Sequence, residues 1–97
     1  MRAYLTPQAE NDVEEIGDYI ALDNAKRAIS FIQEIRQQCE RIAEAPMRYV
    51  ARPDLGEAIR ICVHGNYLIV FEPYADGVLI LRVLHGARNL RGIFGSP

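Results

Sequence analysis

The sequence contains 97 residues, of which 49% are hydrophobic and 25% charged, and its formal net charge is −2. These values are typical of one globular domain over residues 1–97, whose core buries somewhat more than ~60% of the unfolded surface, and they exclude a disordered or collagen-like chain. Because no apolar run reaches ~18 residues and the N-terminus lacks a hydrophobic signal segment, we expect a cytoplasmic protein that does not span a membrane.

The first half of the sequence predicts a short strand followed by two helices. Arg2–Leu5 is the predicted strand, and Thr6-Pro7 is a typical helix start, with a hydroxyl N-cap and proline at the first helical position. A second helix is expected to begin at Asp23-Asn24 and to end before Pro46. The two helices should form an antiparallel hairpin with one shared apolar face. The acidic residues of the first helix are expected on its opposite, solvated face: Glu10, Asp12, Glu14, Glu15 and Asp18.

The second half predicts a three-stranded antiparallel meander over residues 58–85. Gly65-Asn66 favours a two-residue type II′ turn between the first two strands, and Asp76-Gly77 predicts a second tight turn. The loop Pro46–Glu57 is expected to precede these strands. With the N-terminal strand added to the sheet, the order is β-α-α-β-β-β. The predicted fold class is therefore α+β, a small antiparallel sheet packed against an N-terminal helical hairpin.

The most informative segment is the apolar run Val78–Leu84, which Arg82 interrupts and which His85 and Arg88 follow. Such a run is typical of a central strand buried on both faces. An isolated buried charge is very unfavourable, so Arg82 needs solvent or a partner, for which Glu72 or a helix acid is the natural candidate. His85 could contact a phosphate or a protein, or could hydrogen-bond nearby backbone; both readings stay open.

Two cysteines and several aromatic residues have simpler structural interpretations. Cys39 and Cys62 occupy apolar-periodic positions without the spacing of a zinc site, which predicts buried free thiols. Tyr19 and Tyr67 are expected in the core or at its edge. His64, which precedes a predicted turn, is expected to face solvent. We expect no metal site and no cofactor.

Four segments together carry a family resemblance: YLTPQAENDVEEIGDYI, FIQEI with IAEAP, IRICVHGNYLIVFEP and GVLILRVLHGARNL. Over essentially the whole chain they resemble the RelE/ParE superfamily of bacterial toxins, and within it the ParE branch. The resemblance implies the toxin of a type II toxin-antitoxin system, in a hetero-oligomer with a ParD-like antitoxin. It also implies a compact helical hairpin on a small antiparallel sheet and a role in plasmid stabilisation.

The branches of this superfamily imply different activities. RelE-like members are ribosome-dependent mRNA endonucleases, and such cleavage needs cations for the phosphorane charge and groups that move protons. This sequence has Leu68 where those members commonly have arginine, and no tyrosine near its end. The catalytic set is incomplete, so no catalytic residue is assigned and ParE-like inhibition of DNA gyrase is favoured. An endoribonuclease using Arg60, Arg82, His85 and Arg88 remains an alternative, as does a degenerate non-toxic domain that only binds an antitoxin.

Target binding is assigned to the segment from Arg82 to Phe94, with nucleic acid contacted at most through the gyrase-DNA complex. Ile93 and Phe94 are expected to form an exposed apolar patch, since no core position is evident for them. Removing residues 92–97 is therefore expected to leave the fold intact. The predicted target-binding residues are Arg82, His85, Arg88, Arg91, Ile93 and Phe94.

Overall fold

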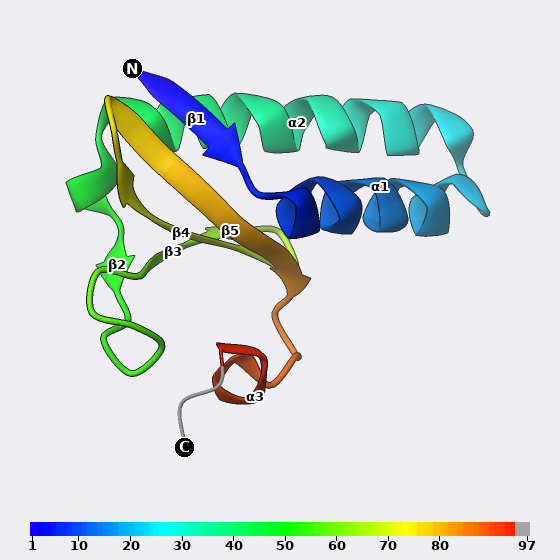
Figure 1. Ribbon diagram of the computed structural model, residues 1–97. Helices are drawn as coiled ribbons and strands as arrows, with labels where there is room; N and C mark the ends of the chain where they lie inside the picture. Colours follow the sequence, from blue (N-terminus) through cyan, green and yellow to red (C-terminus); the bar gives the residue numbers. More distant parts are fainter. Residues whose placement is uncertain (95–97) are drawn as a thin grey trace.

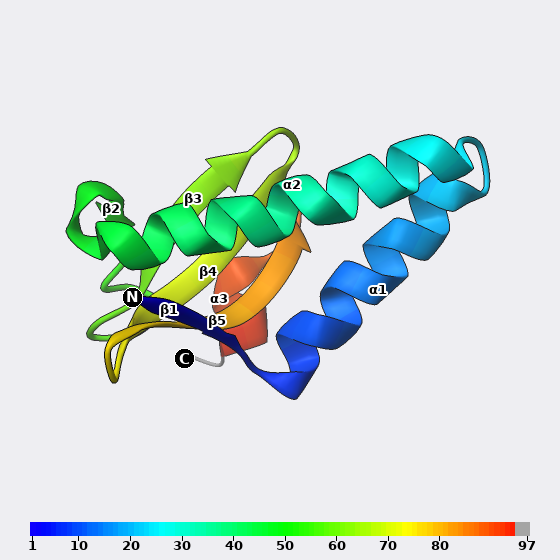
Figure 2. The same ribbon diagram turned by 90° about the horizontal axis from the view of Figure 1, so that it is seen from above.

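The computed structural model describes residues 1–94, which form two long helices over one face of a five-stranded sheet and a short helix on the other face (Figures 1 and 2). The elements are, in chain order, β1 (Arg2–Leu5), α1 (Pro7–Ala21), α2 (Ala25–Glu44), the 3-10 turn Pro46–Arg48, β2 (Val50–Ala51), β3 (Arg60–His64), β4 (Tyr67–Tyr74), β5 (Gly77–His85) and α3 (Leu90–Phe94). The predicted α+β fold and its β-α-α-β-β-β order are confirmed. The short strand β2, within the expected loop, and the helix α3 are additions to it.

The sheet is mixed, because its strand order is β1-β5-β4-β3-β2 and only β1 pairs in parallel. The meander of β3, β4 and β5 is antiparallel as predicted. The end of β1 lies beside the middle of β5, where Leu5 pairs with Ile80. The backbone N–H of Thr6, the next residue, donates to the Ile80 carbonyl at 3.0 Å and continues this pairing to the start of α1. Both strands therefore run toward the start of α1. This parallel pairing differs from the entirely antiparallel sheet that was expected.

Side-chain caps fix both helix starts. The Thr6 hydroxyl accepts from the backbone N–H of Ala9, and the Asn24 side chain accepts from that of Arg27, both at 3.0 Å. These bonds satisfy amide donors that have no partner inside the helix. The helices cross closely at Gly17, where a Cβ would lie 2.7 Å from the Cδ1 of Ile32. The predicted helical hairpin is thus confirmed.

Two tight turns join the strands of the meander. Gly65 has a positive φ of 59°, and His64 pairs with Tyr67 across the turn, which confirms a two-residue loop at Gly65-Asn66. The second loop is Ala75-Asp76, one residue earlier than predicted, because Gly77 already belongs to β5 and pairs with Arg2. A Cβ on Gly77 would lie 1.8 Å from the Arg2 carbonyl oxygen. Glycine is required there by the close approach of β1.

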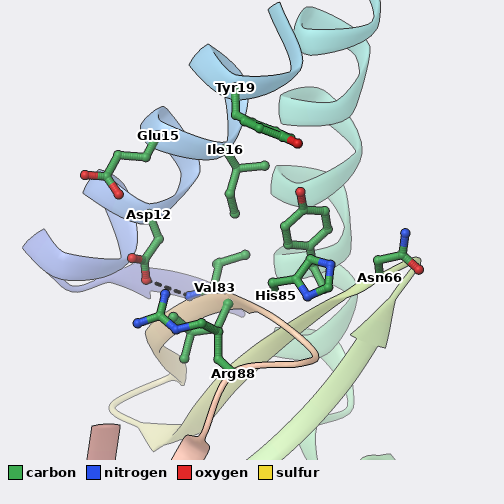
Figure 3. A pocket seen from close by; sticks show the side chains of 10 residues that line it. Asp12, Glu15, Ile16, Tyr19, Asn66, Val83, His85 and Arg88 are labelled. Carbon is green, nitrogen blue, oxygen red and sulfur yellow. Dashed lines mark hydrogen bonds between the residues drawn. The ribbon is translucent and has the colours of Figure 1, made fainter.

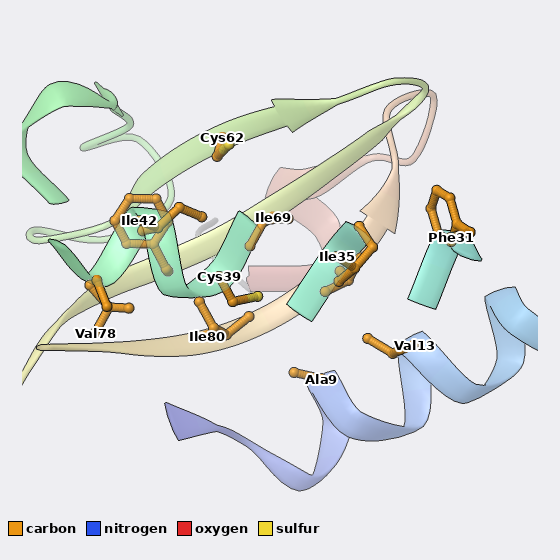
Figure 4. Packing of buried hydrophobic residues seen from close by; sticks show 13 residues of the cluster. Ala9, Val13, Phe31, Ile35, Cys39, Ile42, Cys62, Ile69, Val78 and Ile80 are labelled. Atoms are coloured by element: carbon orange, nitrogen blue, oxygen red, sulfur yellow. The ribbon is translucent and has the colours of Figure 1, made fainter. Parts of the chain in front are cut away.

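The main core lies between the helices and the sheet (Figure 4). Its buried members include Ile35 and Ile42 of α2 and Ile69 and Ile80 of the sheet, all fully excluded from solvent. Both cysteines are buried and free, as predicted. Burial raises the pKa of Cys39 to about 12, so its thiol stays protonated at neutral pH.

A second core lies on the opposite face of the sheet. It is formed by Leu55, Ile59, Val70, Leu84 and Leu90. Ile93 and Phe94 of α3 are partly buried against it. The expectation of an exposed apolar patch at Ile93 and Phe94 is therefore wrong, because both side chains pack against the second core. Helix α3 lies on the face of the sheet that the long helices leave open (Figure 1).

A β-bulge in β5 determines which of its residues face each core. Val70 pairs with Arg82 whereas its neighbour Phe71 pairs with Ile80, so Leu81 is an extra residue in β5. The alternation of side chains between the two faces reverses at this point. As a result Ile80 and Val83 contribute to the main core, and Leu81 and Leu84 pack in the second one. The predicted burial of this strand on both faces is confirmed.

Candidate functional site

A cleft of about 490 Å³ lies between α1 and the end of β5, the strand end that the sequence singled out (Figure 3). One wall is the face of α1 that carries Glu15, Ile16 and Tyr19, and the other is formed by β4, β5 and the turn after β5. Two predicted target-binding residues, His85 and Arg88, line it. The remaining lining residues are Asp12, Asn66, Tyr67, Val83 and Leu84.

Asp12 closes one end of this cleft by binding Arg82. The Nε and Nη2 atoms of Arg82 donate to the two carboxylate oxygens of Asp12 at 2.7 and 2.9 Å, and the backbone N–H of Val83 donates to one of them at 2.9 Å. The hydrogen bonds that Arg82 donates to Asp12 raise the pKa of Arg82 above its usual value. Of the two predicted partners of Arg82, Glu72 and a helix acid, the helix acid is confirmed. The guanidinium faces a smaller hollow with Gln8 and Asn11, outside the main cleft.

The burial of Asp12 corrects the prediction that all acidic residues of the first helix face solvent. Asp12 is only 6% exposed, and it is the one buried charged or polar residue among residues 1–94. A carboxylate is rarely buried unless it is paired and hydrogen-bonded, and here three donors meet that need. The only sequence signal for its role was the buried-strand position of Arg82, which required a partner.

His85 is exposed and is fixed by two local contacts. Its Nδ1 accepts from the backbone N–H of Ala87 at 3.1 Å, which assigns the ring proton of the neutral imidazole to Nε2. Its ring lies edge-on to Tyr67, with 5.5 Å between ring centroids. The backbone hydrogen bond considered for His85 is therefore present. It leaves the Nε2 edge of the ring available to a partner.

Arg88 lies on the turn after β5, between the main cleft and a second hollow of about 340 Å³. Its backbone N–H donates to the carbonyl of His85 at 3.0 Å, which holds the turn closed. Within residues 1–94 its guanidinium makes no ion pair and no side-chain hydrogen bond. Its charge is thus exposed and available to bind an anion.

Arg91 is the second residue of α3 and is tied to the β2–β3 loop. Its Nε lies 3.2 Å from an Asp54 carboxylate oxygen, and Arg52 donates two further hydrogen bonds to Asp54 at 2.9 Å. The hydrogen bonds from Arg52 and then Arg91 hold the pKa of Asp54 far below its usual range. Arg91 remains 71% exposed, and it lines the second hollow with Arg52 and Arg88.

The structure thus divides the six predicted target-binding residues. His85 and Arg88 share the main cleft, Arg88 and Arg91 share the second hollow, and Arg82 is engaged by Asp12. Ile93 and Phe94 pack against the second core.

Of the lining residues of the cleft only His85 and Arg88 were predicted as site residues, and those that sequence reasoning missed include Glu15, Asn66 and Tyr19. Tyr19 was expected at the core but is 72% exposed. It belongs to the site because it lies two helical turns after Asp12, on the same face of α1.

Other predicted features lie elsewhere. Tyr67 packs against the main core as expected. The side chain of His64 is only 19% exposed and lies 3.5 Å from Glu34, so the expected solvent-facing position is wrong. No group of histidine, cysteine and acidic residues that could hold a metal occurs in the described part of the chain. None of the helices over residues 1–94 is long and apolar enough to span a membrane.

Comparisons with known proteins address the identity of this fold. A family model described as the ParE toxin of the type II toxin-antitoxin system, parDE, matches residues 3–90. The chain is also similar to a solved chain from the chromosomal ParDE TA system of P. aeruginosa, with 22% identity, a TM-score of 0.73 and coverage of 88% of this chain and 95% of that one. No curated protein matches it. Because the family match spans most of the sequence, the chain belongs to the ParE toxin family of type II toxin-antitoxin systems.

Proposed function

We propose that this toxin acts in the cytoplasm as an inhibitor of DNA gyrase, that it binds through the end of β5 and the turn after it, and that a ParD-like antitoxin neutralises it. The observation that carries the proposal is the pair of exposed groups at this strand end: the guanidinium of Arg88, which has no ion-pair partner within residues 1–94, and the Nε2 edge of His85. A rigid strand therefore presents a cation and a hydrogen-bond donor beside a cleft. Such groups suit a binding partner that already holds anionic DNA.

An RNA-cleaving activity has less support. Two of the four basic residues that could have formed a phosphate site are engaged, since Arg82 binds Asp12 and Arg60 donates to the Tyr49 carbonyl. Leu68, at the position where the nuclease branch commonly has arginine, packs at the second core. We therefore propose a binding activity without catalysis.

The antitoxin is proposed to bind elsewhere, on the helical hairpin and the open edge of the sheet. Leu22 and Ile29 of the hairpin are 83% and 61% exposed, and Val63 of β3 is 68% exposed. Strand β2 pairs only with Arg60 and Ile61, so the outer edge of β3 beyond them has no partner strand within the described residues. A segment that folds on binding can use both features, by helix docking and by strand addition.

A gyrase supercoiling assay with three purified variants tests the proposal. Arg88→Ala should raise the concentration for half-inhibition by about tenfold, the loss expected for one well-placed charged contact. His85→Ala should weaken inhibition in the same direction. Arg48→Ala removes the same charge from an exposed position outside the cleft and serves as the matched control.

The control should inhibit like the wild-type chain, and ribosome-dependent mRNA cleavage should be absent from all samples. Equal inhibition by the Arg88 and Arg48 variants would remove the proposed binding surface. Messenger cleavage that His85→Ala abolishes would overturn the proposed activity itself.

A further inference from the structure

The contact between Asp12 and β5 lies within the cleft, because Asp12 and Val83 are both lining residues. Asp12 accepts hydrogen bonds from the side chain of Arg82 and from the backbone of Val83, the two residues that follow the bulge in β5. Figure 3 shows Asp12 bound to Val83 at the base of the cleft, with Glu15 and Tyr19 farther along α1 and His85 on the opposite wall. One carboxylate thus connects both walls.

Thr6 holds the same stretch of β5 from the start of α1. Its hydroxyl donates to the Leu81 carbonyl at 2.8 Å, and its backbone N–H donates to the Ile80 carbonyl at 3.0 Å. The two contacts made by Thr6 precede the bulge or lie within it, whereas those of Asp12 follow it. Of these side-chain and capping contacts to β5, those of Asp12 therefore lie nearest to His85.

The chemistry of this anchor fixes orientation as well as distance. Arg82 binds the two carboxylate oxygens with two of its nitrogens, a planar arrangement that allows one relative geometry. The Val83 N–H donates to one of those oxygens, so the backbone of β5 is held by the same carboxylate. Replacing a buried ion pair by apolar groups is often neutral for stability, whereas apolar groups would not specify this orientation.

We propose that Asp12 is a positioning residue for target binding: through Arg82 and Val83 it sets the separation and orientation of the α1 wall, with Glu15 and Tyr19, relative to the β5 wall, with His85 and Arg88. This inference rests on the proposed function, because it concerns the same cleft. It adds α1 to the surface that meets the target. Asp12 itself, being buried, does not touch the target.

Two substitutions perturb the anchor in different ways. Asp12→Asn keeps the size of the side chain but places an amide NH2 against a donor nitrogen of Arg82 and leaves that guanidinium without its counter-charge. Arg82→Lys keeps the charge and the bond from Val83 but cannot bind both oxygens in a plane. Val13→Ala is the control, since Val13 is the next residue of α1, is 3% exposed and packs in the main core without a role in the anchor.

The three variants are compared with the wild-type chain under conditions where urea titration shows each to be folded. Asp12→Asn should raise the concentration for half-inhibition of gyrase by about tenfold, Arg82→Lys by less, and Val13→Ala should leave it unchanged. The amide resonances of His85, Ala87 and Arg88 should shift in the first two variants and stay in place in the third. If Asp12→Asn does not fold, Arg82→Lys decides the question with both measurements.

Two results would overturn the inference: wild-type inhibition and unshifted resonances in the folded anchor variants, or an equal loss of inhibition in Val13→Ala. The resonances separate this inference from the proposed function. A wild-type chain that does not inhibit gyrase would defeat the proposed function, while shifted resonances in Asp12→Asn would still show that Asp12 sets the geometry of the cleft.

Discussion

The two faces of the sheet are covered in different ways. Among residues 1–94, one face is covered by α1 and α2, and its core contains thirteen buried residues, drawn from both helices and from strands β3 to β5. The opposite face is covered by the β2–β3 loop and the short helix α3, and its core contains five of the described residues. Continuous helices pack many side chains against the first face, whereas a loop and a single helical turn cover the second. The comparison indicates that the first face determines the fold and that the second is its less stable half.

Strand β5 takes part in both cores and ends between them. Its bulge sends Val83 to the helix-covered face and Leu84 to the opposite one, and His85 and Arg88 follow directly. The proposed binding groups are therefore attached to the most firmly held strand, while α3, which follows them, belongs to the less stable half. A rigid support with a less stable segment beyond it is a common arrangement for binding residues.

Truncating a side chain in the main core should have the largest effect. Ile80 is fully buried in β5, so Ile80→Ala leaves a cavity and should lower the free energy of unfolding by about 2–5 kcal/mol. Val63→Ala is the control, because Val63 is 68% exposed on β3 and its loss should leave stability nearly unchanged. Urea unfolding followed by circular dichroism measures both. If Ile80→Ala lowers the free energy of unfolding by less than Leu90→Ala, a substitution in the second core, the ranking of the two faces would be reversed.

Removing residues 92–97 should have an intermediate effect. A chain that ends at Arg91 loses Ile93 and Phe94, whose partial burial against the second core corresponds to about 1.5–3 kcal/mol in total. We expect the truncated chain to keep its circular dichroism spectrum at 25 °C but to unfold at lower urea concentration. The expectation drawn from the sequence, that removing this segment leaves the fold intact, stays a prediction, and the packing of Ile93 and Phe94 adds a loss of stability to it. Unchanged stability would show that α3 does not stabilise the far face.

The same contrast explains how much the sequence could predict. The helix hairpin and the meander follow from apolar periodicity, capping residues and turn residues such as Thr6 and Gly65, which act within a few positions of one another. Strand β2 and helix α3 have two and five residues, too few to show a period. Their positions depend on contacts with distant residues, as with Leu90 against the second core. Local patterns thus predict the face that long elements cover.

The site was predictable to a similar degree. The basic strand end was visible in the sequence, because Arg82, His85 and Arg88 interrupt and follow an apolar run. The cleft was not, because its other wall comes from α1, about seventy residues earlier in the chain, as the separation between Asp12 and Arg82 shows. In the sequence Asp12 is one of five acidic residues on α1. The packing of α1 against β5 shows that the Asp12 carboxylate is the buried one.

The smallest effect concerns the pH dependence of the ion pair that holds α3. The guanidinium groups of Arg52 and then Arg91 lower the pKa of Asp54 in the folded state, so this carboxylate stabilises the fold while it is ionised. The contribution is complete above the unfolded pKa of about 3.9 and decreases as the pH falls below that value toward the folded pKa. Between pH 7 and pH 3 the wild-type chain should therefore lose more stability than Asp54→Asn, which lacks this titration.

Asp76→Asn, at the β4–β5 turn, is the matched comparison, since the Tyr4 hydroxyl lowers the pKa of Asp76 at a point remote from α3. The same two substitutions are then made in the chain that ends at Arg91. If each substitution changes the pH dependence of stability there as much as in the full-length chain, Asp54 acts on the β2–β3 loop alone. If the truncation removes part of the Asp54 effect and leaves that of Asp76 intact, the ion pair and the apolar contacts of α3 form one unit on the far face.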